Sequence, residues 1–405
     1  MKILVVAPTP FFSDRGTHIR ILEEALALEK LGHQVTIATY HVGKDISDKI
    51  DTTKIDVRRI RRLLFWYHKL EAGPDWQKVL LDIMLIRKVF NLARTQKPDV
   101  IHGHLHEGVL IGWIVQKALF WRKIKLVADF HGSLTKEMVS HGYLHGELKR
   151  IFSWIEKIID QMGDFAITSS WEGTEAVKKI RTDGKVETVL DGVNLDSFDN
   201  QKTKEEIKKE LELPANKFII GYTGGLVANK GIGYLFEAIL LILEKRRDVY
   251  FLFGGFPPEE VEKFVAKNNL QDFVRLVSPL DYFKLPEFLT VCDLAVDPKD
   301  GGVAQASGKM LNYIAAGLPV VCFEKYNNHL YLDGDGYYAQ EISGKGLARS
   351  IEGAFDDPEL KERGKMNKEQ AKEFSWEKSG REIDGIYKKM IVNHALDVTK
   401  ETSNI

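Results

Sequence analysis

Short β-branched runs alternate with longer helical patterns along most of the chain, and this alternation limits the fold more than any other feature. Near the N-terminus, KILVVAP leads into IRILEEALALEKLGH and then into QVTIATY. Within the middle stretch, Ile19, Leu22 and Ala25 recur at steps of three residues before Gly32, as on one face of a helix. Strands and helices that alternate in this way form a parallel sheet with crossover helices. The sequence therefore predicts an α/β fold.

The length indicates more than one domain, because 405 residues exceed what one hydrophobic core usually holds. The alternation is interrupted at 197–217, a charged stretch that we interpret as a linker, and resumes with FIIGYTG, VYFLFGG and VRLVSP. We predict two doubly wound, Rossmann-like domains facing a central cleft. They would cover residues 1–196 and 197–377, with a C-terminal helix of about 378–405 packing back on the first domain.

Composition excludes several classes of protein. The 57 Lys and Arg residues nearly balance 58 Asp and Glu, so the chain has no general attraction to nucleic acid. Cys292 and Cys322 lie in apolar runs, which makes a disulfide framework unlikely to form and favours a cytoplasmic location. The N-terminus indicates a first strand and not a secretory signal.

The segment 57–70, VRRIRRLLFWYHKL, joins four arginines to aromatic residues. Two interpretations remain open for it. One is a partly buried strand or helix whose arginines extend into solvent. The other is a surface that contacts anionic lipid, which would place the protein peripherally on the inner face of the membrane.

Two segments carry features that bind phosphate. In GYTGGLVANKGIGYL, Gly224 and Gly225 follow a strand and Lys230 precedes a helix, so backbone and charge can approach an anion. The pattern matches neither the P-loop nor GxGxxG, and an ordinary turn with a solvated lysine is the alternative. In SGKMLNYIAAGLPVV, residues 307–310 open a second helix and Lys309 adds charge, with a simply capped helix as the alternative.

Two other signals resemble metal sites. His102, His104 and His106 alternate in IHGHLHEG, but a strand-end loop with one or two polar contacts is the favoured interpretation. Asp333 and Asp335 in YLDGDGYY form a DxD pattern, for which a solvated turn is favoured. The sequence therefore predicts no metal site.

Eight motifs occur in an order that resembles the family 4 type (group 1) retaining glycosyltransferases of the GT-B fold, over about residues 1–390. They are PTPFFSDRGTHIRILEEALALEKLGHQVTIAT, DVIHGH, DFHGS, ITSSWEGTEAV, VLDGVNLDSF, GGLVANKGIGYLFEAI, VRLVSPLDYFKLPEFLTVCDLAVDP and SGKMLNYIAAGLPVV. The resemblance implies an enzyme that moves a hexose from a UDP- or GDP-linked sugar to a glycan or lipid-linked acceptor. It also implies retention at the sugar and no need for a metal or other cofactor.

The same resemblance implies roles for individual residues. Lys230 would contact the donor diphosphate and His131 would lie near the transferred sugar, and we take these two as catalytic. Val277 and Ser278 would lie near the base. The remaining implied substrate-binding residues are Arg15, Gly16, Thr17, Gly224, Gly225, Ser307, Gly308, Lys309, Met310 and Asn312.

Four positions depart from the family's pattern. Gly225 stands where an arginine usually binds phosphate, Ala304 and Asn312 replace a pair of glutamates, and Asp191 replaces an asparagine. An amide still hydrogen-bonds a ribose hydroxyl, whereas the side chain of alanine cannot bind a sugar hydroxyl. These departures keep two alternatives open, a non-catalytic nucleotide- or glycan-binding GT-B module and a sugar-nucleotide epimerase. An NAD dehydrogenase is disfavoured because no GxGxxG follows the first strand.

Overall fold

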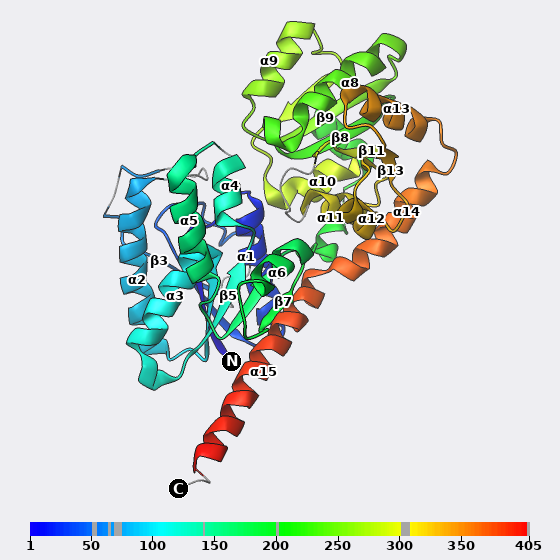
Figure 1. Cartoon of the computed structure of the whole chain (residues 1–405). Helices are drawn as coiled ribbons and strands as arrows, with labels where there is room; N and C mark the ends of the chain where they lie inside the picture. Colours follow the sequence, from blue (N-terminus) through cyan, green and yellow to red (C-terminus); the bar gives the residue numbers. More distant parts are fainter. Residues whose placement is uncertain are drawn as a thin grey trace. The chain divides into compact units, whose positions relative to one another are not determined.

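The computed structural model describes residues 1–50, 55–63, 66–68, 75–140, 142–199, 202–300 and 308–402. These residues form two compact units (Figure 1), the first made of 1–191 and 376–402 and the second of 192–300 and 308–375. The chain thus changes unit close to the predicted boundaries at 196 and 377. Each unit contains a parallel sheet covered by helices, as the alternation predicts.

The sheet of the first unit, among the described residues, has the strand order β3-β2-β1-β4-β5-β6-β7, and its neighbouring strands are parallel. Its strands are β1 (Lys2–Ala7), β2 (Gln34–Thr39), β3 (Ile55–Arg59), β4 (Val100–His104), β5 (Lys125–Phe130), β6 (Phe165–Thr168) and β7 (Val186–Thr188). Its helices are α1 (Gly16–Lys30), α2 (Trp76–Gln96), α3 (Leu105–Ala118), α4 (Leu134–Ser140), α5 (Gly146–Ile159), α6 (Trp171–Lys178) and α15 (Trp376–Thr402), with the 3₁₀ helix η1 (Phe120–Arg122). Strand order reverses between β1 and β4.

The last helix, α15, packs against α1. Gly380 is buried at this contact, and a Cβ atom there would lie 2.7 Å from the Cβ of Ala27. The glycine therefore allows the two helices to approach closely. Further along α15, Oδ1 of Asp384 forms a hydrogen bond with Nε2 of His33 at 3.1 Å, and Tyr387 is fully buried.

The second sheet has the order β10-β9-β8-β11-β12-β13 and is also parallel. Its strands are β8 (Phe218–Gly225), β9 (Val249–Phe256), β10 (Val274–Val277), β11 (Leu294–Asp297), β12 (Val320–Phe323) and β13 (Tyr337–Ala339). Its helices are α7 (Lys204–Glu210), α8 (Ile232–Lys245), α9 (Glu259–Asn268), α10 (Leu285–Thr290), α11 (Gly308–Ala315), α12 (Tyr326–Leu332), α13 (Gly344–Phe355) and α14 (Leu360–Gln370). Its 3₁₀ helices are η2 (Leu195–Phe198), η3 (Ala228–Lys230), η4 (Tyr282–Lys284) and η5 (Ala371–Phe374). Successive residues along a strand belong to two different hydrophobic cores, as Ile219 and Ile220 of β8 show.

The prediction of a linker at 197–217 was wrong. The segment contains α7, and Ile207 and Leu213 are buried in a core of the second unit. Thr203 and Glu206 form a capping box at the start of α7, which stabilises so short a helix. The charged side chains misled the prediction because they occupy the exposed sides of a helix that buries few apolar residues.

We expect Gly380→Ala to lower the free energy of unfolding by about 1–2 kcal/mol, because overpacking at Ala27 outweighs the better helix propensity of alanine. Gly385, also in α15, has no atom within 4 Å of its Cβ position and is the matched control. Gly385→Ala should leave stability unchanged or raise it by up to about 1 kcal/mol. Denaturant unfolding followed by circular dichroism measures both, and equal stability of the two variants would contradict the close contact.

Candidate functional site

The order of the second sheet reverses between β8 and β11, and open α/β sheets bind ligands at such a point, beyond the carboxyl ends of the strands. β8 ends at Gly225, η3 follows, and Gly231 precedes α8. Gly231 has a φ of 78°, and a Cβ there would lie 1.8 Å from the carbonyl oxygen of Pro298. Because glycine permits this approach, Lys230 is held beside the segment that follows β11.

Lysine side chains gather around Asp297, the last residue of β11. Lys309 Nζ lies 3.1 Å from Asp297 Oδ1 and 4.4 Å from the centroid of the Tyr222 ring. Burial and the nearby charge of Lys230 lower the pKa of Lys299 to about 8. Mutual repulsion of this kind is relieved by an anion, so the edge between β8 and β11 is suited to a diphosphate.

Lys309, which the sequence predicts to add charge at the start of α11, pairs with a carboxylate of the protein itself. Its ammonium is buried against Asp297 and Tyr222. Burial alone would lower its pKa, but Asp297 raises it well above the usual value. Lys309 is therefore permanently charged and neutralised by Asp297. The sequence pattern missed this pair because Asp297 belongs to a different strand-loop unit.

The glycines predicted at this edge lie beside the two lysines. A Cβ at Gly224 would be 3.7 Å from Lys309 Cε, and one at Gly225 would be 3.5 Å from Lys230 Cγ. A side chain at either position would therefore contact a lysine stem. Lys230 is half-buried and belongs to η3, so its position next to the strand end agrees with the predicted diphosphate contact.

Helix α11 starts at Gly308, and Ser307 and Ala304 lie outside the described residues. Among the described residues, a Cβ at Gly308 would meet no atom within 4 Å. The Asn312 side-chain amide donates to the carbonyl oxygen of Gly308 at 2.7 Å, which leaves its own oxygen as an acceptor. The Met310 side chain is fully buried, and this residue offers a ligand only its backbone.

Val277 ends β10 and Ser278 follows it. Within the described part of the chain, Ser278 Oγ is buried without a hydrogen-bond partner. β10 lies two strands from β8 in the sheet, a separation of about 10 Å. This spacing allows one extended ligand to reach both strand ends.

In the first unit, α1 begins at Gly16 with Arg15 as its N-cap residue, and Gly16 is exposed while Thr17 is half-buried. A hydrogen bond holds the loop before α1 against this helix, because the backbone amide of Ser13 donates to Nδ1 of His18 at 3.0 Å. Burial lowers the pKa of His18 to about 3, so the ring stays neutral and accepts this bond. The open first turn agrees with a place for an anionic or hydroxylated ligand.

A buried ionic group lies beneath the carboxyl edge of this sheet. The Arg20 guanidinium on α1 donates to both carboxylate oxygens of Asp129 on β5, at 3.2 and 3.3 Å, and to Asp191 Oδ1 at 2.7 Å. Burial alone would raise the pKa of Asp129, but Arg20 and the neighbouring histidines hold it well below its usual range. Burial raises the pKa of Glu24 well above its usual value even though Arg20 lies 2.8 Å away.

His131 is joined to this group through His104. Its Nε2 lies 3.0 Å from His104 Nδ1, which in turn lies 3.3 Å from Asp129 Oδ2. Since a carboxylate only accepts, His104 Nδ1 carries the proton and His131 Nε2 accepts. Burial lowers the pKa of both rings, to about 4 for His104. Neutral His131 thus keeps its own proton on Nδ1, where it can donate to a hydroxyl oxygen.

The loop prediction for the three histidines of IHGHLHEG was wrong. His102 and His104 belong to β4 and His106 to α3, and all are buried. Their partners come from distant parts of the sequence, including Tyr387 on α15, whose hydroxyl contacts His102 Nδ1. No short-range pattern could have shown these contacts.

Two groups of these side chains, among the described residues, are close enough to hold a metal ion, with ligand atoms within 4.8 Å of one another. They are Glu24, His102, His104 and Asp129, and separately His106, Glu156 and Asp160. In the first group, the Arg20 guanidinium already contacts both carboxylates. In the second, burial alone would lower the pKa of His106, but Asp160 at 3.3 Å raises it. The Arg20 guanidinium therefore balances charge in the first group, and His106 pairs with Asp160 in the second.

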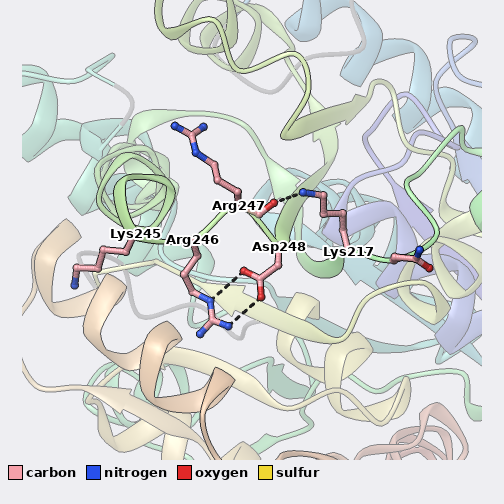
Figure 2. Close-up of a pocket in the computed structure, with 6 residues that line it drawn as sticks. Lys217, Lys245, Arg246, Arg247 and Asp248 are labelled. Atoms are coloured by element: carbon pink, nitrogen blue, oxygen red, sulfur yellow. Dashed lines mark hydrogen bonds and ion pairs between the residues drawn. The ribbon is translucent and has the colours of Figure 1, made fainter.

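A hollow at the other edge of the second sheet has a different character. Figure 2 shows Lys217, Lys245, Arg246, Arg247 and Asp248 around it, with Asn216 completing the lining. These residues precede β8 and β9, so the hollow lies at the amino ends of the strands. Arg246 pairs there with Asp248 at 3.0 Å. The hollow is thus remote from the edge that carries Lys230.

We expect the first unit to lose stability as the pH falls from about 6.5 to about 4. The lowered pKa of His104 means that the unfolded chain binds a proton in this window and the folded chain does not. This one ring should account for about 3 kcal/mol. His104→Gln should lower stability at pH 7 and weaken the pH dependence.

The matched control is His145→Gln, at an exposed histidine of the same unit. It should keep the pH dependence of the parent protein in thermal melts at pH 7 and pH 5. An unchanged pH dependence in His104→Gln would contradict the neutral buried imidazole.

Comparison with known proteins agrees with this arrangement. D-inositol 3-phosphate glycosyltransferase of Corynebacterium glutamicum is 23% identical over 94% of this chain and 93% of its own length. Among solved structures, sucrose-phosphate synthase of Thermosynechococcus elongatus superposes with a TM-score of 0.77 at 18% identity, covering 97% of this chain and 99% of that one. Anabaena Alr3699/HepE, solved with UDP and glucose, gives a TM-score of 0.75 at 15% identity, covering 96% and 100%.

Two family models match successive parts of the sequence. Glycosyltransferase Family 4 matches residues 15–197, and Glycosyl transferases group 1 matches residues 217–357. The first match lies almost wholly in the first unit and the second lies within the second unit. The chain therefore belongs to the family 4, group 1 glycosyltransferases of the GT-B fold.

Proposed function

We propose that this glycosyltransferase moves a hexose from a UDP- or GDP-linked sugar to a glycan or lipid-linked acceptor in the cytoplasm, with retention and without a required metal. The observation that carries the proposal is the group of lysines at the β8–β11 edge, where the charges of Lys230 and Lys299 repel each other. An anionic diphosphate would relieve that repulsion. Anabaena Alr3699/HepE, solved with UDP and with UDP-glucose, supports a nucleotide-sugar donor.

The chemistry of such a transfer depends on the leaving group. Negative charge develops on the departing diphosphate, and fixed cations and amides stabilise it in the transition state. Lys230 and the first amides of α11 would supply this stabilisation. Retention would then follow from attack on the same face of the sugar, directed by the donor.

His131 would act at the sugar. Its proton on Nδ1 can donate to a sugar hydroxyl, and its orientation is set by His104 and Asp129. The C-terminal unit would bind the nucleotide, with Ser278 Oγ as a donor or acceptor for the base. Asn312 Oδ1 would accept from a ribose hydroxyl.

The second candidate is a non-catalytic module that binds a nucleotide or a glycan. Gly225 favours it, because the side chain that usually binds phosphate in the family is missing there. Calorimetry with UDP-, GDP- and ADP-sugars separates the two functions. Nucleotide binding without hydrolysis or transfer to any acceptor would support the module.

Lys230→Ala should weaken the binding of UDP or GDP by about 10- to 100-fold. A hydrogen bond to a charged group contributes about 1.5–3 kcal/mol, which corresponds to that range of Kd. Lys267→Ala, an exposed lysine on α9, is the control and should bind normally. Unchanged affinity and unchanged transfer in Lys230→Ala would overturn the diphosphate assignment.

His131→Ala should reduce turnover by at least about tenfold while the Kd of the donor stays within about twofold, since a lost contact to the reacting sugar acts mainly on the transition state. Single-turnover transfer and calorimetry measure the two quantities. His145→Ala serves as the control. Normal turnover in His131→Ala would remove this residue from the catalytic set.

A further inference from the structure

Helix α2 exposes apolar side chains on the side away from the core. Leu81, Leu85 and Val89 are fully buried. On the opposite side of its first two turns, Trp76 is 71% exposed. The other exposed apolar residues of these turns are Val79, Leu80 and Ile83. Such residues, spaced by three and four positions, form a second apolar stripe that has no partner among the described residues.

Helix α5 repeats this feature. Its inner face buries Ile159, and Phe152 and Ile155 are half-buried. Trp154 is 65% exposed on the outer side. Leu148, Ile151 and Ile158 are the remaining exposed apolar residues of this helix. Two neighbouring helices of one unit thus each present a tryptophan and several aliphatic side chains to solvent.

The two stripes belong to one surface, because α2 and α5 both pack against α3 (Figure 1). Between them, α3 presents the half-buried Trp113, with Lys117 Nζ 5.9 Å from the centroid of its ring.

At the start of α2, Trp66 donates from Nε1 to Gln77 Oε1 at 3.0 Å. The exposed Leu63 and Trp66 therefore extend the surface into the basic-aromatic segment 57–70. We call the whole the α2–α3–α5 surface.

Basic side chains border these apolar residues. Lys149 and Lys157 are exposed on α5, Arg87 on α2 and Lys117 on α3. Arg61 and Arg62 are exposed beside Leu63. By contrast, Arg59 of the same segment donates to the carbonyl oxygens of Val42 and Lys44 and serves the fold.

We propose that the α2–α3–α5 surface docks on the anionic face of a lipid bilayer. Tryptophan and aliphatic side chains beside lysine and arginine are the composition of helices that lie in the membrane interface. No helix in the described part of the chain is long and apolar enough to cross a membrane, so the contact is peripheral. A symmetric contact between two copies would place these basic borders against each other, and that repulsion disfavours a second copy as the occupant.

The inference rests on the proposed function in one respect, since a lipid-linked acceptor would explain why the enzyme docks. The docking itself is measured without any transfer assay. The two proposals can therefore fail separately.

The test is flotation of the purified full chain with vesicles. Vesicles of phosphatidylcholine mixed with phosphatidylglycerol should bind the protein at least tenfold more tightly than vesicles of phosphatidylcholine alone. Raising the salt from about 0.1 M to about 1 M, which shortens the Debye length from about 10 Å to about 3 Å, should weaken the binding. No binding of the parent protein, or equal binding to both kinds of vesicle, would overturn the proposal.

Two variants locate the surface. Trp154→Glu and Ile83→Glu change exposed side chains, so both should keep the parent melting temperature and each should lose at least tenfold in vesicle binding. Tyr326→Glu is the control, because Tyr326 is an equally exposed aromatic residue on α12 of the other unit. Equal effects of all three substitutions would contradict the assigned surface.

A dimer in light scattering that Trp154→Glu converts to monomer, without vesicle binding, would identify a second copy as the occupant and overturn the proposal.

Discussion

Parallel strands all end at the same edge of a sheet, because each crossover helix returns the chain to the opposite edge. Both units obey this constraint, and it brings together residues that are far apart in sequence. In the second unit it places the end of β8, at Gly225, and the end of β11, at Asp297, on the same edge of the sheet. In the first it places His104 at the end of β4 beside Asp129 of the neighbouring strand. The candidate site residues lie at these two edges.

Buried charges are neutralised in different ways at the carboxyl edges of the two sheets. In the first unit, the Arg20 guanidinium donates to Asp129 and Asp191, and burial lowers the pKa of His104 and His131, so these two imidazoles remain neutral. In the second unit, the buried carboxylate of Asp297 holds Lys309, and the charge of Lys230 helps to lower the pKa of Lys299. A neutral, hydrogen-bonding edge suits sugar hydroxyls and a cationic edge suits phosphates. The two sheet edges thus differ in electrostatic character.

The sequence predicted the α/β class, two units and most strands, because periodicity and turn residues are local properties. It also predicted the neighbourhood of Lys230 and Gly225, which share one strand-turn-helix segment. It missed Asp297 as the partner of Lys309 and Arg20 as the partner of Asp129, since such pairs arise only when strands are ordered in a sheet. The charged segment 197–217 shows the opposite error, in which composition concealed a helix that contributes Ile207 to a core.

The contact of Tyr387 with His102 has a consequence for how the chain is made. Residues 376–402 belong to the first unit but follow the whole of the second unit in sequence. The second unit is complete in sequence before they appear, so it can fold during translation while the first unit still lacks its final helix. The histidines of the first sheet would remain partly uncovered until α15 is synthesised. The order of synthesis thus separates the maturation of the two halves of the enzyme in time.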